Sequence, residues 1–190
     1  MKKVAVIEGG YSKEKAISIK SAKTVFDNFD RTKFDPIRVL IDKKEWTAYD
    51  NEGRYSIDKN DFSYIKNGSK YNFEYAFIVI HGTPGEDGKL QGYLDMVGVP
   101  YNTSSAAIMA LTFQKFHCNQ FLKNFGINVP EAVLIKSEDV FDERQIIDKV
   151  KLPCFVKPTD GGSSFGITKV KILNEILPAI KKAFENGTEV

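Results

Sequence analysis

Strand and helix patterns alternate through the N-terminal half of the chain. Residues 4–7 are continuously apolar and rich in β-branched side chains, which predicts a buried strand. Apolar positions at three- and four-residue spacing predict a helix over residues 12–29, capped by Ser12. Residues 73–80 form the strongest strand pattern, and residues 89–96 suit a helix. Shorter strand patterns occupy residues 36–41, 46–49 and 55–57. Strands alternating with helices predict an α/β fold with a parallel sheet covered by helices on both faces.

A second series of elements follows residue 104. The expected helices lie at residues 105–124 with a break near Thr112, at 137–150 with Ser137 as cap, and at 174–186. The expected strands lie at residues 131–135, 154–157 and 167–170. We therefore predict two domains, 1–104 and 105–190. Residues 188–190 read as the beginning of another strand, so we expect the natural protein to continue beyond this point.

Composition excludes several classes of protein. The 14 Phe and 8 Tyr residues are too many apolar anchors for a disordered chain, and 27 basic against 25 acidic residues argue against a nucleic-acid binder that works by charge neutralisation. The longest apolar run, residues 75–80, is far shorter than the roughly 20 residues that cross a membrane. Two cysteines, Cys118 and Cys154, cannot build a disulfide framework, which favours a reducing, cytoplasmic location.

The first candidate site lies at Gly9-Gly10, directly after the first strand. A glycine pair allows a tight turn into a helix N-terminus, whose exposed N–H groups favour an anion or a polar ligand. The third glycine of the dinucleotide fingerprint is absent. Glu14, in the first helical turn, is a candidate binding residue. Alternatively, it only complements the helix dipole.

The second candidate site is the glycine-rich loop over residues 81–88, which follows the strongest strand. Ligands of parallel α/β sheets bind beyond the carboxyl ends of the strands, and His81 stands at such an end. A structural histidine is the alternative interpretation. Glu86 and Asp87 are equally compatible with a loop that is ordered by its own hydrogen bonds.

The third candidate site is a Gly/Ser-rich turn after a strand, in which Lys157 precedes Gly162, Ser163 and Ser164. Backbone N–H groups and hydroxyls of such a turn can surround phosphate oxygens, while the lysine supplies the charge. A simple hairpin turn is the alternative, and both can hold at once. Lys115 is a weaker candidate on a predicted helix. The sequence contains neither C-x-x-C nor H-E-x-x-H, so no metal site is predicted within it.

Together these segments resemble the D-alanine–D-alanine ligases of the ATP-grasp superfamily. The resemblance rests on four blocks in the family's order, at residues 8–18, 81–92, 98–101, and 152–158 with 162–166. The second block, H-G-x-x-G-E-D-G-x-L-Q-G, is long and specific. The resemblance implies a Rossmann-like (pre-ATP-grasp) N-terminal domain over 1–104 and a central ATP-grasp lobe over 105–190. The C-terminal lobe would be absent from this chain.

The resemblance implies ATP-dependent ligation of two D-alanines for cytoplasmic peptidoglycan precursor synthesis. The carboxylate of the first D-alanine is phosphorylated by ATP, the amine of the second attacks the acylphosphate, and phosphate leaves. The family also implies Mg²⁺, whose ligands we expect beyond Val190, so these 190 residues alone should be inactive. It further implies a homodimer, with no nucleic-acid or membrane partner.

Carried onto this sequence, the family's pattern assigns roles to the candidate residues. Glu14 would hold the ammonium of the first D-alanine, and Ser163 would hydrogen-bond with Glu14. His81 would lie near the carboxylate of the first D-alanine. Lys115 and Lys157 would contact the ATP phosphates, over which the backbone of residues 162–164 would lie.

Three departures from the family's pattern weaken individual assignments. Ala16 stands where an acidic residue is common, Gln114 replaces the aspartate before Lys115, and Asn119 replaces a later lysine. A D-alanine–D-lactate ligase or another ATP-grasp carboxylate–amine ligase remains an alternative, as does a non-catalytic binding module. A dinucleotide-dependent oxidoreductase is weaker, because the glycine fingerprint is absent.

Overall fold

The computed structural model describes residues 1–162 and 165–190. The chain divides into two compact units, Met1–Ala110 and Leu111–Val190, called here the N-terminal unit and the C-terminal unit. The predicted domain boundary after residue 104 lies shortly before this division. Helix α3 (Ala106–Phe113) crosses it.

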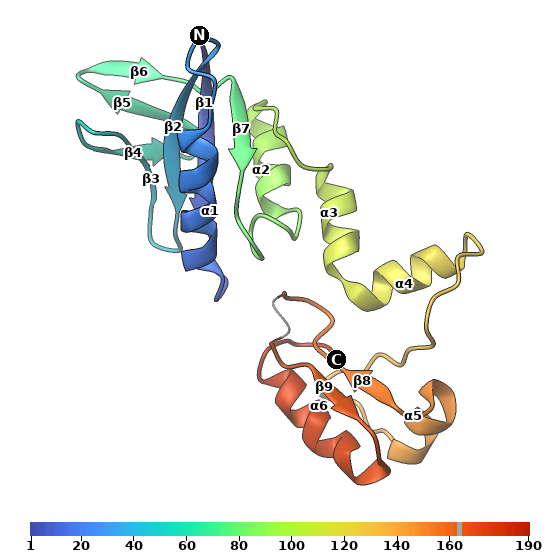
Figure 1. Cartoon of the computed structure of the whole chain (residues 1–190). Helices are drawn as coiled ribbons and strands as arrows, with labels where there is room; N and C mark the ends of the chain where they lie inside the picture. The colour runs from blue at the N-terminus through green and yellow to red at the C-terminus, as the bar shows by residue number, and fades with distance from the viewer. Residues whose placement is uncertain (163–164) are drawn as a thin grey trace. The chain divides into compact units, whose positions relative to one another are not determined.

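A seven-stranded mixed sheet forms the centre of the N-terminal unit, in the order β6-β5-β4-β3-β2-β1-β7 (Figure 1). Its strands are β1 (Lys2–Gly9), β2 (Phe34–Ile41), β3 (Trp46–Tyr49), β4 (Arg54–Asp58), β5 (Ser63–Lys66), β6 (Ser69–Tyr71) and β7 (Tyr75–Ile78). β1 pairs in parallel with β2 and with β7, which confirms the predicted parallel sheet for these three strands. The other neighbours pair antiparallel, which extends the sheet in a way that the sequence patterns did not indicate.

Two helices cover opposite faces of the parallel strands. Leu90 and Leu94 of α2 (Lys89–Val97) belong to the same core as Ile7, whereas the adjacent Glu8 points to the other face. On that face lies α1 (Lys15–Asp27), which receives a hydrogen bond at Ile19 O from the guanidinium that pairs with Glu8. The prediction of helices on both faces is therefore confirmed.

Aromatic side chains hold the antiparallel strands together. The rings of Tyr64 and Tyr71 stack at 5.3 Å, and Phe62, which is fully buried, packs edge-on against Trp46 and Tyr93. β5 and β6 are joined by Asn67-Gly68, both of which have positive φ. Positive φ at both central residues is the condition for a tight two-residue hairpin, and Asn-Gly meets it readily.

A buried ion pair lies at the carboxyl end of β1. The carboxylate of Glu8, 1% exposed, accepts from Arg38 Nε at 2.9 Å and from the hydroxyl of Tyr49. Burial, together with the hydrogen bond to this carboxylate, raises the pKa of Tyr49 well above its ordinary value. Since Arg38 is also largely shielded from water, each charge depends on the other for compensation.

The C-terminal unit packs helices against a small antiparallel sheet. Its elements are α4 (Lys115–Lys123), α5 (Glu143–Val150), β8 (Cys154–Val156), β9 (Thr168–Val170), the 3₁₀ turn η1 (Leu173–Glu175) and α6 (Ile176–Phe184). Its core joins Ile146 of α5, Val170 of β9 and Ile176 and Ile180 of α6. Pro178 lies in the first turn of α6, where its missing N–H is harmless.

Three local predictions were wrong. Residues 131–135 do not form a strand; instead, Ile135 exchanges two backbone hydrogen bonds with Val190. α5 begins at Glu143 rather than near Ser137, because the Asp142 carboxylate caps it by accepting from Arg144 N at 2.8 Å. Glu14, not Ser12, occupies the N-cap position of α1.

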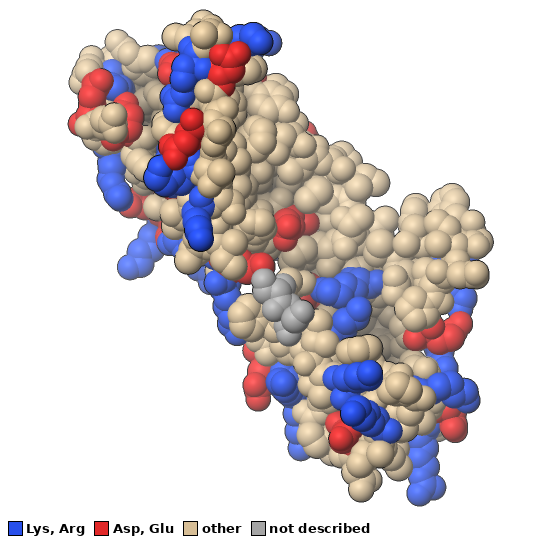
Figure 2. All heavy atoms as spheres, in the orientation of Figure 1, with Lys and Arg blue, Asp and Glu red and all other residues tan. Residues whose placement is uncertain are grey.

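Charge is mixed over the surface. On the face seen in Figure 2, basic and acidic side chains are interspersed over the N-terminal unit, consistent with the formal net charge of +2. Among the described residues, no helix has the length and apolar character needed to span a membrane.

The ion pair predicts a specific stability effect. Arg38→Leu leaves the Glu8 carboxylate buried without its cation, so we expect the unfolding free energy of the N-terminal unit to fall by about 3 kcal/mol. Urea denaturation followed by the fluorescence of Trp46, the chain's single tryptophan, measures it. The double variant Glu8→Leu/Arg38→Leu should recover most of the loss, because it buries no lone charge.

The exposed Lys23–Asp27 pair of α1 provides the control for this measurement. Lys23→Ala should leave the urea midpoint unchanged, because water already solvates both groups. An equal loss of stability in the single and double variants at Glu8 and Arg38 would show that the uncompensated charge is not the cause.

Candidate functional site

Two loops of the N-terminal unit lie at the same end of the sheet, beyond the carboxyl ends of parallel strands. β1 and β7 are parallel neighbours, so the loop after Gly9 and the loop after Ile80 both follow carboxyl ends. Gly9 and Gly10 have φ of +95° and +92°, and a Cβ on Gly10 would lie 2.6 Å from Ile80 Cγ2. Only glycine meets both conditions, which confirms the tight turn that the sequence predicted.

Glu14 and His81 are brought together by these loops. Glu14 is half-buried at the N-cap of α1, and a Cβ built on Gly82 would lie 3.7 Å from its Oε2. Ser12 Oγ donates to His81 O at 2.7 Å and accepts from Glu14 N at 3.1 Å. The Ser12 hydroxyl therefore joins the backbones of Glu14 and His81 where the two loops meet, and the Glu14 carboxylate lies beside Gly82, the residue after His81.

The imidazole of His81 carries an unmet hydrogen-bonding group. Among the described residues, its Nε2 is buried and has no hydrogen-bond partner. A buried polar atom in this state costs free energy that a polar ligand can recover. The site thus combines an anion, Glu14, with a ring nitrogen that still has a hydrogen bond to make.

The rest of the 81–88 loop is ordered by its own contacts. Glu86 Oε2 accepts from Gly82 N at 2.7 Å, and the Asp87 carboxylate pairs with Lys89. Gln91, fully buried, donates from Nε2 to Gly85 O at 2.7 Å. The interpretation that both loop carboxylates serve the loop itself is therefore confirmed. The sequence analysis gave no role to Gln91. A glutamine inside a predicted helix carries no signal that its side chain will hold a neighbouring loop.

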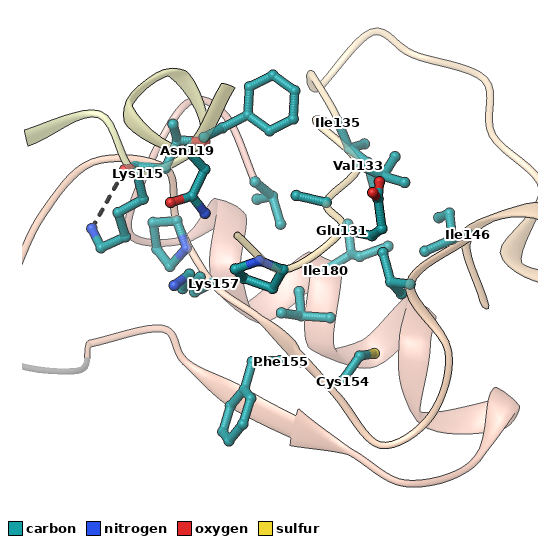
Figure 3. Close-up of a pocket in the computed structure, with 18 of the residues that line it drawn as sticks. Lys115, Asn119, Glu131, Val133, Ile135, Ile146, Cys154, Phe155, Lys157 and Ile180 are labelled. Carbon is teal, nitrogen blue, oxygen red and sulfur yellow. Dashed lines mark hydrogen bonds between the residues drawn. The ribbon is translucent and has the colours of Figure 1, made fainter. Parts of the chain in front are cut away.

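A cavity of about 300 Å³ lies within the C-terminal unit. Figure 3 shows Lys115, Asn119 and Lys157 on one side of it and Ile146 and Cys154 on the other. Its apolar lining comes from α5, α6, β8 and the segment before Lys136, and includes Val133, Ile135, Val150, Val156, Ile176, Ile180 and Val190. The cavity thus has a mainly apolar lining with Lys115 and Lys157 on one side, and Glu131 also contributes to its wall.

Lys115 is the first residue of α4 and is held at the mouth of the turn after β8. Its Nζ donates to Gly161 O at 2.7 Å and to Thr159 O at 3.4 Å, the latter drawn in Figure 3. Burial, and next the positive charge of Lys157, lower its pKa, while Asp160 acts in the opposite direction. The residue pattern alone made Lys115 only a weaker candidate on a predicted helix, and the structure places it in the cavity wall.

The donors at this end suit an anion. Thr159 Oγ1, which can donate, is buried without a hydrogen-bond partner among the described residues. Together with the two lysines and the N-terminus of α4, the Thr159 hydroxyl can serve phosphate oxygens. Gly162 is exposed in the adjoining turn, and Ser163 and Ser164 lie outside the described residues.

The described part of the chain offers little for a metal ion. The described residues contain no group of three or more His, Cys, Asp or Glu side chains placed to hold one. Mg²⁺, which the sequence resemblance implied, therefore has no fitting ligand set in this part of the protein.

The apolar wall of the cavity was missed by the sequence analysis, although its pattern was present. Ile146 and Val150 recur at four-residue spacing in α5, and Ile176 and Ile180 do so in α6. Such stripes normally indicate core packing, and here the same side chains serve both the core and the cavity.

Comparisons with known proteins agree across both units. The family model described as "D-ala D-ala ligase N-terminus" matches residues 3–104, and "D-ala D-ala ligase C-terminus" matches residues 121–190. The chain is 46% identical over 192 residues to the D-alanine–D-alanine ligase of Azobacteroides pseudotrichonymphae and 47% identical over 191 residues to that of Parabacteroides distasonis. Each alignment covers 100% of this chain but only 59% and 58% of the relative, respectively.

Solved structures show the same relationship. The D-alanine–D-alanine ligase of Coxiella burnetii has a TM-score of 0.87 at 26% identity, with 100% of this chain and 62% of that one covered. VanG, a D-Ala:D-Ser ligase from Enterococcus faecalis, has a TM-score of 0.83 at 33% identity, with 99% and 61% covered. Because the first family model alone matches more than half of the 190 residues, and the second most of the remainder, the chain belongs to the D-alanine–D-alanine ligase family.

Proposed function

We propose that the protein to which this chain belongs joins two D-alanines at the expense of ATP, for peptidoglycan precursor synthesis. The observation that carries the proposal is the convergence of Glu14 and His81 at one edge of the sheet, in a chain 46% identical to a named D-alanine–D-alanine ligase. The chain spans less than two thirds of that relative, so the activity is proposed for the full-length gene product.

The N-terminal unit would bind the first D-alanine. A zwitterionic amino acid offers an ammonium group to the Glu14 carboxylate and a carboxylate to the His81 imidazole, whose Nε2 is without a partner among the described residues. In the family's pattern Ser163 would complete this site through a hydrogen bond with Glu14; it lies outside the described residues. Glu14, His81 and Ser163 are thus proposed as the residues that orient the reacting carboxylate.

The C-terminal unit would bind ATP in its cavity. The apolar end suits a purine, and Lys115 and Lys157 supply positive charge for the phosphates. The turn that contains Gly162, Ser163 and Ser164 would add backbone N–H groups over the phosphates. The magnesium ions expected with ATP would take their ligands from outside the described residues.

The chemistry then consists of two displacements. A carboxylate oxygen of the first D-alanine attacks the γ-phosphorus, the bond to the bridging oxygen breaks, and ADP leaves. The amine of the second D-alanine attacks the acyl carbon and loses a proton, and inorganic phosphate leaves. Charge develops on phosphoryl oxygens in the first step, so lysines that are fixed before the reaction stabilise its transition state.

We also propose a cytoplasmic homodimer. The free cysteines Cys118 and Cys154 suit a reducing compartment, and the dimer is inferred from family membership. A different second substrate is the main alternative for the reaction. VanG, a D-Ala:D-Ser ligase, is 33% identical to this chain, and D-lactate is a further possible acceptor.

The proposed activity predicts a substrate-specific effect of Glu14. The full-length gene product should release phosphate and D-alanyl-D-alanine from ATP and D-alanine. Glu14→Gln removes the charge that faces the ammonium, so the KM for the first D-alanine should rise roughly 10- to 100-fold. Coupled phosphate release, with product identified by mass spectrometry, measures both quantities.

The exposed Glu52 supplies the matched control, since Glu52→Gln makes the same change of charge in the turn between β3 and β4, at the opposite end of the sheet from the two loops. Its kinetics should equal those of the unsubstituted enzyme. Product formed with D-serine or D-lactate but not with D-alanine would favour the alternative acceptors. D-alanine binding without phosphate release under any acceptor would indicate a binding module and contradict the proposal.

The lowered pKa of Lys115 leads us to expect that ATP binding depends on pH. Bound phosphate favours the ammonium form, whereas burial and Lys157 lower the pKa of the free site below the ordinary 10.5. Affinity should therefore be constant while Lys115 is protonated and fall as the pH rises through its lowered pKa. Calorimetric titration of the full-length gene product with ATP, from about pH 7 to about pH 10, measures the decline.

Two variants separate Lys115 from other titrating groups. Lys115→Arg stays charged across this range, so its affinity should no longer decline at the same pH. Lys157→Ala removes the neighbouring like charge and should move the decline to higher pH, with weaker binding throughout. An unchanged decline in Lys115→Arg would assign the titration to another group.

A further inference from the structure

Ser12 occupies the contact between the two loops of the candidate D-alanine site. Its hydroxyl donates to His81 O at 2.7 Å and accepts from Glu14 N at 3.1 Å. A hydroxyl is the smallest side-chain group that both donates and accepts. The single Ser12 oxygen therefore links the backbone of the residue proposed for the ammonium to the backbone of the residue proposed for the carboxylate.

The space around Ser12 leaves no room for a larger link. Gly82 has φ of +73°, and a Cβ on it would lie 2.7 Å from Ser12 Cβ and 3.0 Å from Ser12 Oγ. The loops are also joined next to this point, where Tyr11 N donates to Thr83 O at 2.8 Å. Ser12 and Gly82 thus set how closely the two loops approach.

The neighbouring contacts do not duplicate this link. Ser18 Oγ joins Gly9 N to Val79 O, which ties α1 to the strand ends before either loop begins. Glu86 holds Gly82 N from within its own loop. The Ser12 hydroxyl, by contrast, bonds to the backbone of both Glu14 and His81.

We propose that Ser12 is a positioning residue that sets the separation of Glu14 and His81 and so determines affinity for the first D-alanine. The inference rests on the proposed function, because it takes Glu14 and His81 as the two ends of the D-alanine site. Ser12 itself touches neither the reacting atoms nor the nucleotide cavity, whose described lining lies entirely in the C-terminal unit. Its loss should therefore weaken D-alanine binding while leaving ATP binding intact.

The test is steady-state kinetics of the full-length gene product carrying Ser12→Ala. Loss of both hydrogen bonds should raise the KM for the first D-alanine about tenfold, with the KM for ATP unchanged and kcat within about twofold. A D-alanine titration analysed for two sequential sites separates the first substrate from the second. Thermal unfolding of the same variant reports any loss of stability.

Ser63→Ala is the matched control. Ser63 is 1% exposed in the same unit, and its hydroxyl donates to Asp61 Oδ1 at 2.6 Å, away from both loops. It should lower the melting temperature by a similar amount while leaving both KM values unchanged. A merely structural role for Ser12 would make the two variants behave alike.

The outcomes separate this inference from the function on which it rests. An active enzyme that Glu14→Gln impairs, but whose KM for D-alanine is unchanged in Ser12→Ala, overturns the positioning role alone. D-alanine and ATP KM values that rise together in Ser12→Ala overturn it as well. Absence of ligation in the unsubstituted enzyme would instead overturn the proposed function.

Discussion

The parallel pairing of β1 with β7 is the constraint on which the candidate D-alanine site depends. Its register joins Val4 to Tyr75 and Ile7 to Ile78, and both strands run in the same direction. The loops that carry Glu14 and His81 therefore emerge side by side, although 67 positions separate the two residues in sequence. A shift of one residue in this register would turn alternate side chains to the other face. Backbone hydrogen bonds and buried aliphatic side chains thus place the polar groups.

The end of β1 is held by polar contacts directly below the site. Glu8 and Arg38 form the buried pair on the α1 face, one residue before the turn at Gly9. Ser18, also fully buried, joins Gly9 N and Val79 O to α1. A buried pair of charges contributes little net stability, but it tolerates few alternative arrangements. The pair thereby ties the end of β1 to Arg38 of β2.

The sequence predicted what local pattern determines. The β-branched run at residues 4–7 and the glycines beside it led directly to β1 and its tight turn. The apolar residues at 131–135 led to a wrong strand prediction, because a strand also needs a neighbouring strand to pair with. Of these five residues only Ile135 forms such backbone hydrogen bonds, with Val190. The hairpin at Asn67-Gly68 was overlooked although its turn residues were explicit. The cavity could not be read from the sequence, because α5 and α6 form its wall only after packing together.

The two candidate sites divide opposite charges between the units: Glu14 is the acidic group of one, and Lys115 and Lys157 are the basic groups of the other. Burial, and next repulsion by the positive charge of Lys157, lower the pKa of Lys115. The repulsion persists until an anion lies between or beside them, and the N-terminus of α4 favours the same anion. An anion bound near both lysines would offset this repulsion, so we expect this end of the cavity to favour a multiply charged ligand over a neutral one.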